Sequence, residues 1–402
     1  MMDFLPENII AYFQPILSAD SNKVYSYEVL GRYIDNDGTV KSLGAFFNDE
    51  KTTDEEALEA DRIVRKYALK KYAEEKRDEY LFINIRLAWL ERFKDRPEEL
   101  PTIIWTREFG IDPGRIVIEI TEQEFNASDA HINVLSYYKN AGFRIALDDY
   151  GKNASNIERL SLLQPDIIKI DIDYIHKSEN SYHYREYLRA LASFAEAVGI
   201  EVLYEGIETQ RQLDICMSSR GRFYQGFLFA PPQASMRDAI VNHNVFSASN
   251  KDAYEVLQKR ILYADLLKSY LDSKVGIFLI DNPLFYEKEN VEEYLSKLCM
   301  ELPEVVRIYL CNKFGEQITY NFEWHSEKIT LCDYRGKNWM WRGFFSEALE
   351  AMIEGRKSCL STVYRDFTTK KRIYTYFYAL NNNIFLFADI NRIPLPFRQE
   401  TL

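Results

Sequence analysis

Seven apolar runs in the first 230 residues each stop at a side chain that can bind a metal ion or a phosphate. The residues at these stops are Glu28, Asn84, Glu119, Asp148, Asp171, Glu205 and Gln225. Parallel strands that are buried on both faces read as continuous apolar runs. In a closed α/β barrel their carboxyl ends form one face, where catalytic residues collect. One acidic strand end is usually a solvated edge, but seven in succession predict a shared site.

The order of the elements predicts a barrel that opens with one antiparallel strand. Residues 10–17 and 23–30 have strand character, and the short polar connection between them favours a hairpin. From there helices alternate with strands, and right-handed crossovers between such units close a barrel. We expect strands at 80–85, 115–120, 143–148, 166–171, 200–205 and 222–228, and helices at 54–75, 87–95, 128–141, 183–198 and 208–218.

Beyond residue 275 the alternation disappears and the pattern becomes α+β. We expect strands at 303–311, 316–321, 361–367, 371–379 and 383–390, and helices at 289–301 and 343–354. Residues 251–272 carry an apolar stripe at helical spacing, which fits a helix packed on a neighbouring domain or a linker that transmits a state or supports a dimer. The predicted organisation is a barrel at 1–245, a linker helix at 246–274 and an α+β domain at 275–402.

Composition argues against several classes of protein. The formal net charge of −12 disfavours binding to long nucleic acids. The five cysteines are scattered without a C-x-x-C pair, so neither a disulfide framework nor a zinc site is indicated. The first residues do not resemble a signal peptide, and no uninterrupted apolar stretch is long enough to span a membrane. We therefore expect a cytoplasmic protein.

The predicted site offers oxygen ligands, which suit Mg²⁺, Mn²⁺ or Ca²⁺ rather than zinc. In the adjacent pair Asp148 and Asp149, one carboxylate can bridge two metals while its neighbour reaches the second, as two-metal phosphodiester cleavage requires. Lys169 lies two residues before Asp171, so both would point to one face, and Lys169 could orient a water or take its proton. Arg32 could hold a phosphate. These residues predict a metal-dependent phosphodiesterase acting on a soluble anionic ester.

Eight motifs, in order along residues 1 to about 240, resemble those of the EAL domain family. They are Gln14-Pro15-Ile16, Glu28-Val29-Leu30-Gly31-Arg32, Asn84, Glu119-Ile120-Thr121-Glu122, Asp148-Asp149-Tyr150-Gly151, Lys169-Ile170-Asp171, Glu205-Gly206-Ile207-Glu208 and Gln225-Gly226-Phe227. The resemblance implies a modified TIM barrel that hydrolyses cyclic di-GMP to linear pGpG with two Mg²⁺ or Mn²⁺ ions. Some members of the family have lost turnover and act as cyclic di-GMP receptors.

The resemblance also implies a role for each matching residue. Lys169 is similar to the residue that positions the attacking water, assisted by Gln225 and Asp171. Gln14 and Arg32 resemble nucleotide contacts. Glu122 and Glu208 resemble structural residues, the former holding the loop after Asp149. The ligands of the first metal would be Glu28, Asn84, Glu119 and Asp148, and those of the second would be Asp148, Asp149 and Glu205.

The loop after Asp149 departs from the family, which commonly has Asp-Asp-Phe-Gly-Thr-Gly-Tyr-Ser-Ser. Here Asn153 replaces the second glycine and Ala154 replaces the tyrosine. In the family this loop lies beside the second metal and the contact between two subunits, and we expect a homodimer. Two functions therefore stay open, a cyclic di-GMP phosphodiesterase and a receptor that binds cyclic di-GMP without useful turnover.

The whole chain resembles YkuI-like two-domain proteins, in which a PAS- or Cache-like domain follows the EAL barrel. Residues Trp339, Arg342 and Phe345 resemble a Trp-x-x-Arg-x-x-Phe element of Cache sensors. The alternative is that these aromatic residues are ordinary core. The resemblance implies a small ligand or a protein partner, of unknown identity, for the second domain.

Overall fold

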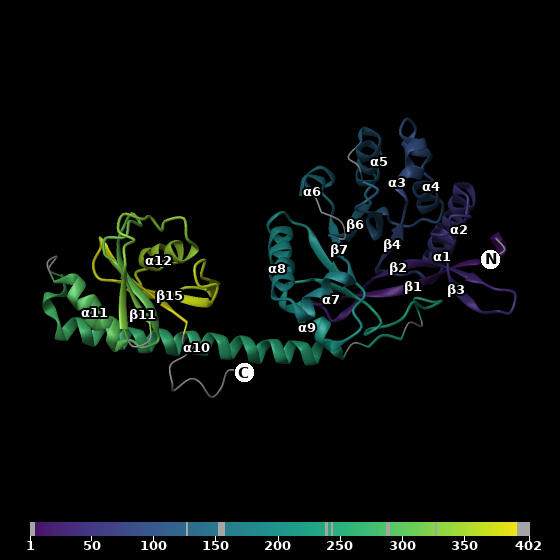
Figure 1. Ribbon diagram of the computed structural model, residues 1–402. Coiled ribbons are helices and arrows are strands. Elements are labelled where there is room, and N and C mark those ends of the chain that lie inside the picture. The colour runs from purple at the N-terminus through teal and green to yellow at the C-terminus, as the bar shows by residue number, and fades with distance from the viewer. Residues whose placement is uncertain are drawn as a thin grey trace. The chain divides into compact units, whose positions relative to one another are not determined.

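The computed structural model describes residues 5–125, 128–151, 157–237, 240–242, 244–286, 290–325 and 328–391. The chain divides into two compact units, Met1–Tyr254 and Glu255–Leu402 (Figure 1). Each unit has a hydrophobic core of its own.

A nine-stranded sheet builds the first unit, and all of its strands except β3 (Val40–Ser42) close into a barrel. Strand β1 pairs antiparallel with both β2 and β9, whereas the other neighbouring barrel strands are parallel, so the predicted antiparallel opening strand is confirmed. The barrel strands are β1 (Ile9–Ser18), β2 (Lys23–Ile34), β4 (Tyr80–Asn84), β5 (Ile116–Thr121), β6 (Arg144–Tyr150), β7 (Ile167–Ile170), β8 (Glu201–Tyr204) and β9 (Phe223–Gln225).

Alternate residues of each buried strand belong to two different apolar clusters. In β5, Ile116 and Ile118 pack in the large cluster that includes the surrounding helices, whereas Val117 packs in a smaller cluster of strand residues. Successive side chains of a strand point to opposite faces, so the two clusters are the outside and the inside of the barrel. The interior cluster consists of Ile16, Phe82, Val117, Ala146, Ile167, Leu203 and Phe223.

The helices of the first unit follow the expected order, with several additions. Helix α2 (Asp54–Glu75) begins at a capping box between Thr53 and Glu56, and α5 (Asp129–Asn140), α8 (Tyr182–Ala197) and α9 (Gln210–Ser218) lie where the sequence predicts them. The expected helix at 87–95 is a short α3 (Leu87–Leu90) followed by a 3₁₀ turn. The sequence analysis missed α1 (Gly44–Phe47), α4 (Pro101–Glu108), α6 (Ile157–Leu163) and α7 (Ile172–Asn180).

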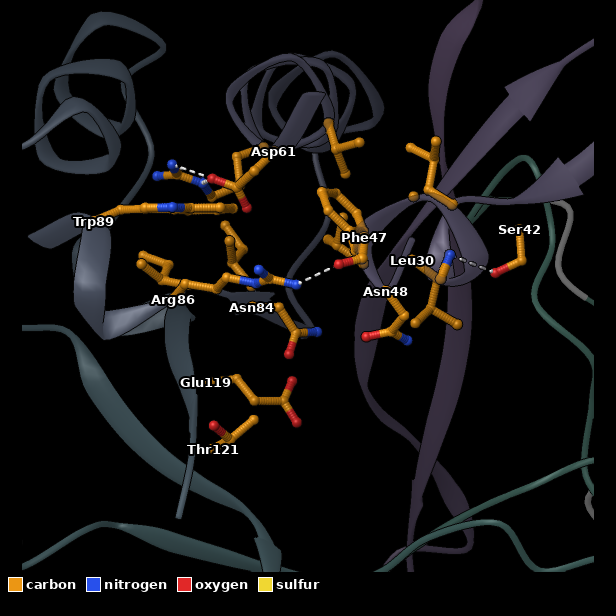
Figure 2. Close-up of a pocket in the computed structure, with 18 of the residues that line it drawn as sticks. Leu30, Ser42, Phe47, Asn48, Asp61, Asn84, Arg86, Trp89, Glu119 and Thr121 are labelled. Carbon is orange, nitrogen blue, oxygen red and sulfur yellow. Dashed lines mark hydrogen bonds and ion pairs between the residues drawn. The ribbon is translucent and has the colours of Figure 1, made fainter. Parts of the chain in front are cut away.

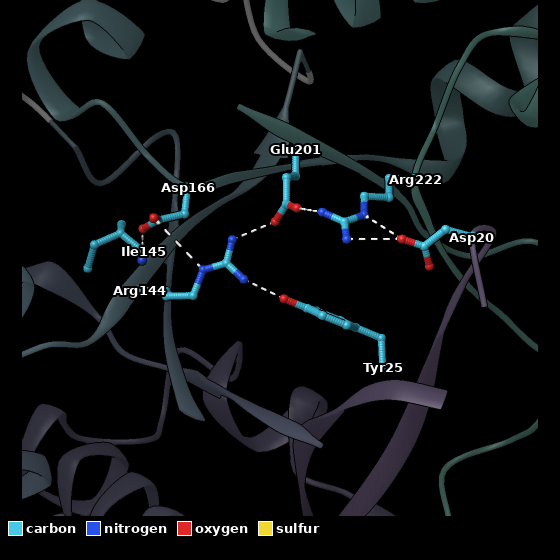
Figure 3. Close-up of polar contacts among 7 residues, drawn as sticks. All are labelled: Asp20, Tyr25, Arg144, Ile145, Asp166, Glu201 and Arg222. Atoms are coloured by element: carbon cyan, nitrogen blue, oxygen red, sulfur yellow. Dashed lines mark hydrogen bonds and ion pairs between the residues drawn. The ribbon is translucent and has the colours of Figure 1, made fainter. Parts of the chain in front are cut away.

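A network of polar side chains ties the strands together at their amino ends (Figure 3). Arg144, the first residue of β6, bonds to Glu201, the first residue of β8, and to the hydroxyl of Tyr25 in β2. Arg222 also reaches Glu201, and its Nη2 atom lies 3.0 Å from Asp20 Oδ2. This end of the barrel is closed by ion pairs, which leaves the carboxyl ends of the strands as the open end.

The second unit is an antiparallel sheet with helices on both faces. Its strand order is β12-β11-β10-β16-β15-β13, and β14 pairs with β15. In β10, Ile308 and Leu310 pack with α11 (Val291–Glu301) and the later part of α10 (Val245–Asp281), whereas Tyr309 and Cys311 pack with α12 (Gly343–Ile353). The strands are β10 (Val305–Asn312), β11 (Asn321–His325), β12 (Lys328–Cys332), β13 (Ser358–Leu360), β14 (Tyr364–Arg365), β15 (Arg372–Ala379) and β16 (Ile384–Ile390).

Two expected strands of the second unit are placed wrongly. The strand predicted at 361–367 is reduced to β14 (Tyr364–Arg365), and β13 (Ser358–Leu360) was not predicted. The strand predicted at 316–321 begins only at Asn321, and β12 was not predicted. Polar side chains take the hydrogen-bond positions that a regular ladder would use, because Gln317 Nε2 donates to Thr319 O at 2.9 Å and Thr319 Oγ1 accepts from Leu310 N at 3.0 Å. A turn follows β10, closed by Asn312 N donating to Glu316 O at 2.9 Å.

Helix α10 is longer than the stripe at 251–272 suggests, and its first turn belongs to the barrel core. Phe246 is fully buried and lies 5.6 Å from the ring centroid of Tyr224 and 5.5 Å from that of Phe229. Ser249 on the next turn bonds to Asp214 of α9. Within the described residues, no helix is both long and apolar enough to cross a membrane.

The packing of Phe246 predicts where the barrel can be cut. We expect fragment 1–254 to unfold cooperatively by urea titration and fragment 1–244 to be less stable by about 3–5 kcal/mol, the usual cost of losing a buried Phe. Phe246→Ala in fragment 1–254 should show a similar loss, whereas truncating the exposed Tyr254 in that fragment to Ala should show little. Equal stability of the two fragments would contradict the assignment of this turn to the barrel core.

Candidate metal and phosphodiester site

Polar side chains stand directly above the apolar layer inside the barrel. Asn84, Glu119, Asp148, Lys169, Glu205 and Gln225 each lie two residues after a member of the interior cluster. Residues two apart on a strand point to the same face, so these side chains also point into the barrel. The structure therefore brings the predicted strand-end residues together at one mouth.

The ammonium group of Lys169 lies at the centre of the site. Lys169 is 1% exposed, and its Nζ atom lies 2.9 Å from Glu205 Oε2, 3.1 Å from Asp148 Oδ1 and 3.7 Å from Glu28 Oε2. It also forms a close ion pair with Glu119, which is fully buried. Burial alone would lower the pKa of Lys169, but the carboxylates of Asp148, Glu119 and Glu205 raise it well above its usual range. Lys169 is therefore a charged hydrogen-bond donor here.

A β-bulge places the two neighbouring aspartates on the same site. Asp148 and Asp149 are consecutive in β6 and would point to opposite faces of a regular strand. The pairing of β6 with β7 shifts register between Leu147 and Tyr150, and Asp149 has φ of 55°. Asp tolerates this left-handed conformation better than most residues. One oxygen each of Asp148, Asp149 and Glu205 consequently lie within 4.8 Å of one another.

The donor set fits divalent cations. Both carboxylate oxygens of Glu119 and Oδ1 of Asp148 are buried, and the Lys169 ammonium is the cation that faces Glu119 Oε1 and Asp148 Oδ1. Burial raises the pKa of Glu119 well above its usual range, and burial together with Asp148 raises the pKa of Glu205 to about 8. One ammonium cannot balance this many carboxylates, and oxygen-only donors suit Mg²⁺, Mn²⁺ or Ca²⁺.

Amide side chains hold Glu28 in place. Its two carboxylate oxygens accept from Asn84 Nδ2 at 3.2 Å and from Gln225 Nε2 at 2.7 Å. The Gln225 amide also reaches Gln14 Oε1 at 3.3 Å, and Gln14 Nε2 donates to the carbonyl of Ala230 at 3.2 Å. Gln14 therefore belongs to the network that orients Glu28.

Three predicted residues lie at the edge of this cluster. Asp171 was expected on the same strand as Lys169, but β7 ends at Ile170 and Asp171 caps helix α7, its Oδ1 accepting from Asp173 N at 2.7 Å. Glu122 Oε2 accepts from Gly151 N at 3.1 Å and so holds the backbone after Asp149. Glu208 is exposed, and its side chain meets no site residue among those described. Asn153 and Ala154, which depart from the family motif, lie outside the described residues.

A cavity of about 430 Å³ opens beside Asn84 and Glu119 (Figure 2). Arg32 lines it and forms no ion pair with a described residue, its Nη1 donating to the carbonyl of Gly31 at 2.9 Å. The guanidinium of Arg86 lies near two aromatic rings, with its Cζ 5.6 Å from the Phe47 centroid and 5.2 Å from that of Trp89. The cavity therefore combines a free cation with flat side chains.

The sequence analysis did not identify Phe47, Arg86 or Trp89 as site residues. Arg86 follows the end of β4 by two residues, and that position was the only available signal. Trp89 reads as an ordinary apolar residue of a helix, and Phe47 comes from a distant segment that only the fold brings near.

Comparison with known proteins identifies the family. The EAL domain model matches residues 3–232, and the model of an EAL-domain associated signalling protein domain matches residues 253–402. The chain is 31% identical to the uncharacterized EAL-domain containing protein YkuI of Bacillus subtilis, over 96% of this chain and 94% of YkuI. The chain belongs to the EAL domain family and shares the two-domain organisation of YkuI.

Solved structures agree with this assignment. The crystal structure of Bacillus subtilis YkuI in complex with the substrate c-di-GMP and calcium superimposes with a TM-score of 0.88 at 29% identity, over 98% of this chain and all of that one. Klebsiella pneumoniae BlrP1 with manganese and c-di-GMP has a TM-score of 0.51 at 27% identity, over 58% of each chain. The probable cyclic di-GMP phosphodiesterase PdeB of Escherichia coli is 25% identical over 56% of this chain but 42% of its own length.

The carboxylate cluster predicts that divalent ions stabilise the fold. At about 100 times the dissociation constant, an ion adds about 2.7 kcal/mol, or roughly 5–10 °C in melting temperature for a unit of this size. We expect Mg²⁺, Mn²⁺ or Ca²⁺ to give such a shift after treatment with a chelator, and Asp148→Asn to lose most of it. Glu196→Gln, an exposed carboxylate on α8, should retain the shift. Identical melting curves with and without millimolar ions would contradict the site.

Proposed function

We propose that this chain hydrolyses cyclic di-GMP to linear pGpG with two divalent ions, Mg²⁺ or Mn²⁺. The observation that carries the proposal is the buried Lys169 ammonium held against the carboxylates of Glu119, Asp148 and Glu205 at the open end of the barrel. The YkuI complex with c-di-GMP and calcium supports the choice of ligand, and the BlrP1 complex supports manganese.

The site residues divide the chemistry among them. A pair of bound divalent ions supplies an activated water and neutralises the phosphodiester charge. Lys169 donates a hydrogen bond that orients the water for attack on phosphorus. The water gives up a proton to solvent as its oxygen bonds to phosphorus, the bond from phosphorus to the 3′ oxygen breaks, and that oxygen takes up a proton from solvent to leave linear pGpG. The residues that would hold the two ions are Glu28, Asn84, Glu119 and Asp148 for one, and Asp148, Asp149 and Glu205 for the other.

The cavity beside the cluster suits the rest of the nucleotide. Arg32 has donors available for a phosphate oxygen. Phe47, Trp89 and the guanidinium of Arg86 offer flat side chains for a guanine base, and base stacking on aromatic side chains contributes about 1–3 kcal/mol per base. Asp171, Gln14 and Gln225 would support the site indirectly, by capping α7 and by orienting Glu28.

A receptor that binds cyclic di-GMP without useful turnover is the second candidate. Asn153 and Ala154 favour it, because they replace a glycine and a tyrosine of the family motif in the loop after Asp149. In either case we propose a homodimer whose second unit is a PAS- or Cache-like sensor. Incubation of the purified protein with cyclic di-GMP and Mg²⁺ or Mn²⁺, followed by separation of the nucleotides, distinguishes the two functions.

For Lys169→Ala, we expect turnover to fall by about 10²–10⁴-fold, the usual range for loss of such a group. Affinity for cyclic di-GMP, measured by calorimetry with Ca²⁺ in place of Mg²⁺, should change much less, because Arg32 and the flat side chains remain. Lys70→Ala, on the exposed face of α2, is the matched control and should leave both quantities unchanged.

Near-normal turnover of Lys169→Ala would exclude the role given to Lys169. Tight binding by the wild-type protein without any pGpG would establish the receptor instead. Absence of binding at micromolar cyclic di-GMP would remove both candidate functions.

A further inference from the structure

The second unit contains a small cavity on the side of its sheet that faces α12. The cavity has a volume of about 70 Å³ and is lined by side chains from β10, the start of α12, β14 and β16. Two arginines, Arg307 and Arg342, line it, together with two buried aspartates, Asp366 and Asp389. The two arginines have different surroundings, and this difference indicates the chemistry of a ligand.

Arg307 forms ion pairs with two aspartates. Its Nη2 atom lies 2.9 Å from Asp366 Oδ2 and its Nε atom 3.2 Å from Asp389 Oδ2. Each aspartate has a further donor, since Asp366 Oδ2 accepts from Thr369 N at 2.7 Å and Asp389 Oδ1 accepts from Thr375 Oγ1 at 2.6 Å. The carboxylates of the cavity are therefore satisfied, and neither is left over for a cationic ligand.

Arg342 has no carboxylate partner among the described residues. Its guanidinium lies over aromatic rings, with Cζ 4.3 Å from the centroid of Phe367 and 4.9 Å from that of Tyr364. Phe367 stacks on Trp341 with ring centroids 6.0 Å apart, and these two rings are 63% and 66% exposed. The guanidinium also meets the Tyr364 hydroxyl, and its remaining edge donors are directed by the aromatic faces and can bind an anion.

Two further donors line the same cavity without a partner in the described part of the chain. The hydroxyl of Tyr309 and the amide nitrogen of Asn321 belong to residues that are 3% and 2% exposed, and neither donates to a described residue. Asn321 is oriented through its oxygen, which accepts from Gln317 Nε2 at 2.8 Å. Helix α12 begins beside the cavity with no side chain capping its N-terminus. Tyr309 and Asn321 both line the open space of the cavity, so their donors can reach a bound acceptor.

We propose that this cavity binds a small aliphatic monocarboxylate. The ligand carboxylate would accept from Arg342 and from the free donors of Asn321 and Tyr309, and its short apolar part would lie against Phe344 and Tyr364. A volume of about 70 Å³ leaves room for a small ligand only. Acetate, propionate, pyruvate and lactate have this size and charge. An amino acid fits less well, because both aspartates are already bound to Arg307.

The residues of the Trp-x-x-Arg-x-x-Phe element at 339–345 therefore have different surroundings. Trp339 lines the cavity and is held by its Nε1 atom, which donates to Gln317 Oε1 at 2.8 Å. Arg342 supplies the free cation. Phe345 is fully buried in the core between α12 and the sheet, as the alternative of ordinary core packing expects.

The test is a titration of the full-length protein with acetate, propionate, pyruvate and lactate at constant ionic strength. Binding is measured by the shift in melting temperature and by calorimetry. We expect at least one of these carboxylates to bind saturably, and acetamide and propionamide, which lack the charge, to bind at least tenfold more weakly. Alanine should bind more weakly than propionate. Chloride at the same concentration is the control for adventitious anion binding.

Two variants separate the proposed contacts from effects on folding. Arg342→Gln removes the cation, and Asn321→Asp keeps the oxygen that accepts from Gln317 while it replaces the free donor with a negative charge. Each should weaken carboxylate binding at least tenfold with a melting temperature near that of the wild type in the absence of ligand. Arg335→Gln, on an exposed arginine paired with Asp333, should bind as the wild type does.

No saturable binding of any of the four carboxylates to the wild-type protein would overturn the proposal, as would equal binding of propionamide. Alanine binding tighter than propionate would overturn the assigned class of ligand. Unchanged affinity in both Arg342→Gln and Asn321→Asp would place the carboxylate elsewhere.

Discussion

The charge balance around Lys169 is the constraint on which the barrel mouth depends. Placing several carboxylates in a buried cluster is unfavourable unless cations lie among them, since a buried charge without a partner costs several kcal/mol. Lys169 supplies one positive charge and meets four carboxylates from other parts of the barrel mouth. The remaining negative charge is retained at a cost to the stability of the protein, and such a cost is typical of a site that is completed by metal ions.

Two departures from regular backbone geometry hold this cluster in place. The bulge in β6 directs Asp148 and Asp149 to the same side. At the end of β9, Gly226 adopts φ of 155° and lets the chain pass so close to residue 207 that a Cβ atom would lie 2.0 Å from the Ile207 carbonyl oxygen. The Ile207 amide donates to the Gln225 carbonyl at 2.9 Å, so this close approach fixes the residue that orients Glu28. The glycine is required by space as much as by its conformation.

The sequence predicted those parts of the fold and site that follow from periodicity. Continuous apolar runs located the barrel strands, and the polar residue that ends each run located the site, because parallel strands end on one face. The bulge at Asp149 and the capping role of Asp171 were not predictable, because periodicity does not show a shift of one residue in strand pairing or in where a strand ends. Phe47, Arg86 and Trp89 were missed because their association depends on loops that meet only in the folded chain. In the second unit, the prediction of a strand at 316–321 was wrong, because side chains of Gln317 and Thr319 take hydrogen bonds that backbone groups would make in a regular strand.

The two units have opposite imbalances of polar groups. Each imbalance indicates whether the ligand carries positive or negative charge. At the barrel mouth, carboxylate oxygens outnumber the donors that face them, so the deficit is of positive charge. In the cavity of the second unit, two aspartates pair with Arg307, and Arg342, Tyr309 and Asn321 line the cavity without a carboxylate partner among the described residues, so the cavity offers donors to an acceptor. Folding selects against buried polar groups without partners. Where such groups persist in a described core, a ligand of the complementary sign is the simplest physical reason, and in the second unit that reason is independent of any resemblance to a known family.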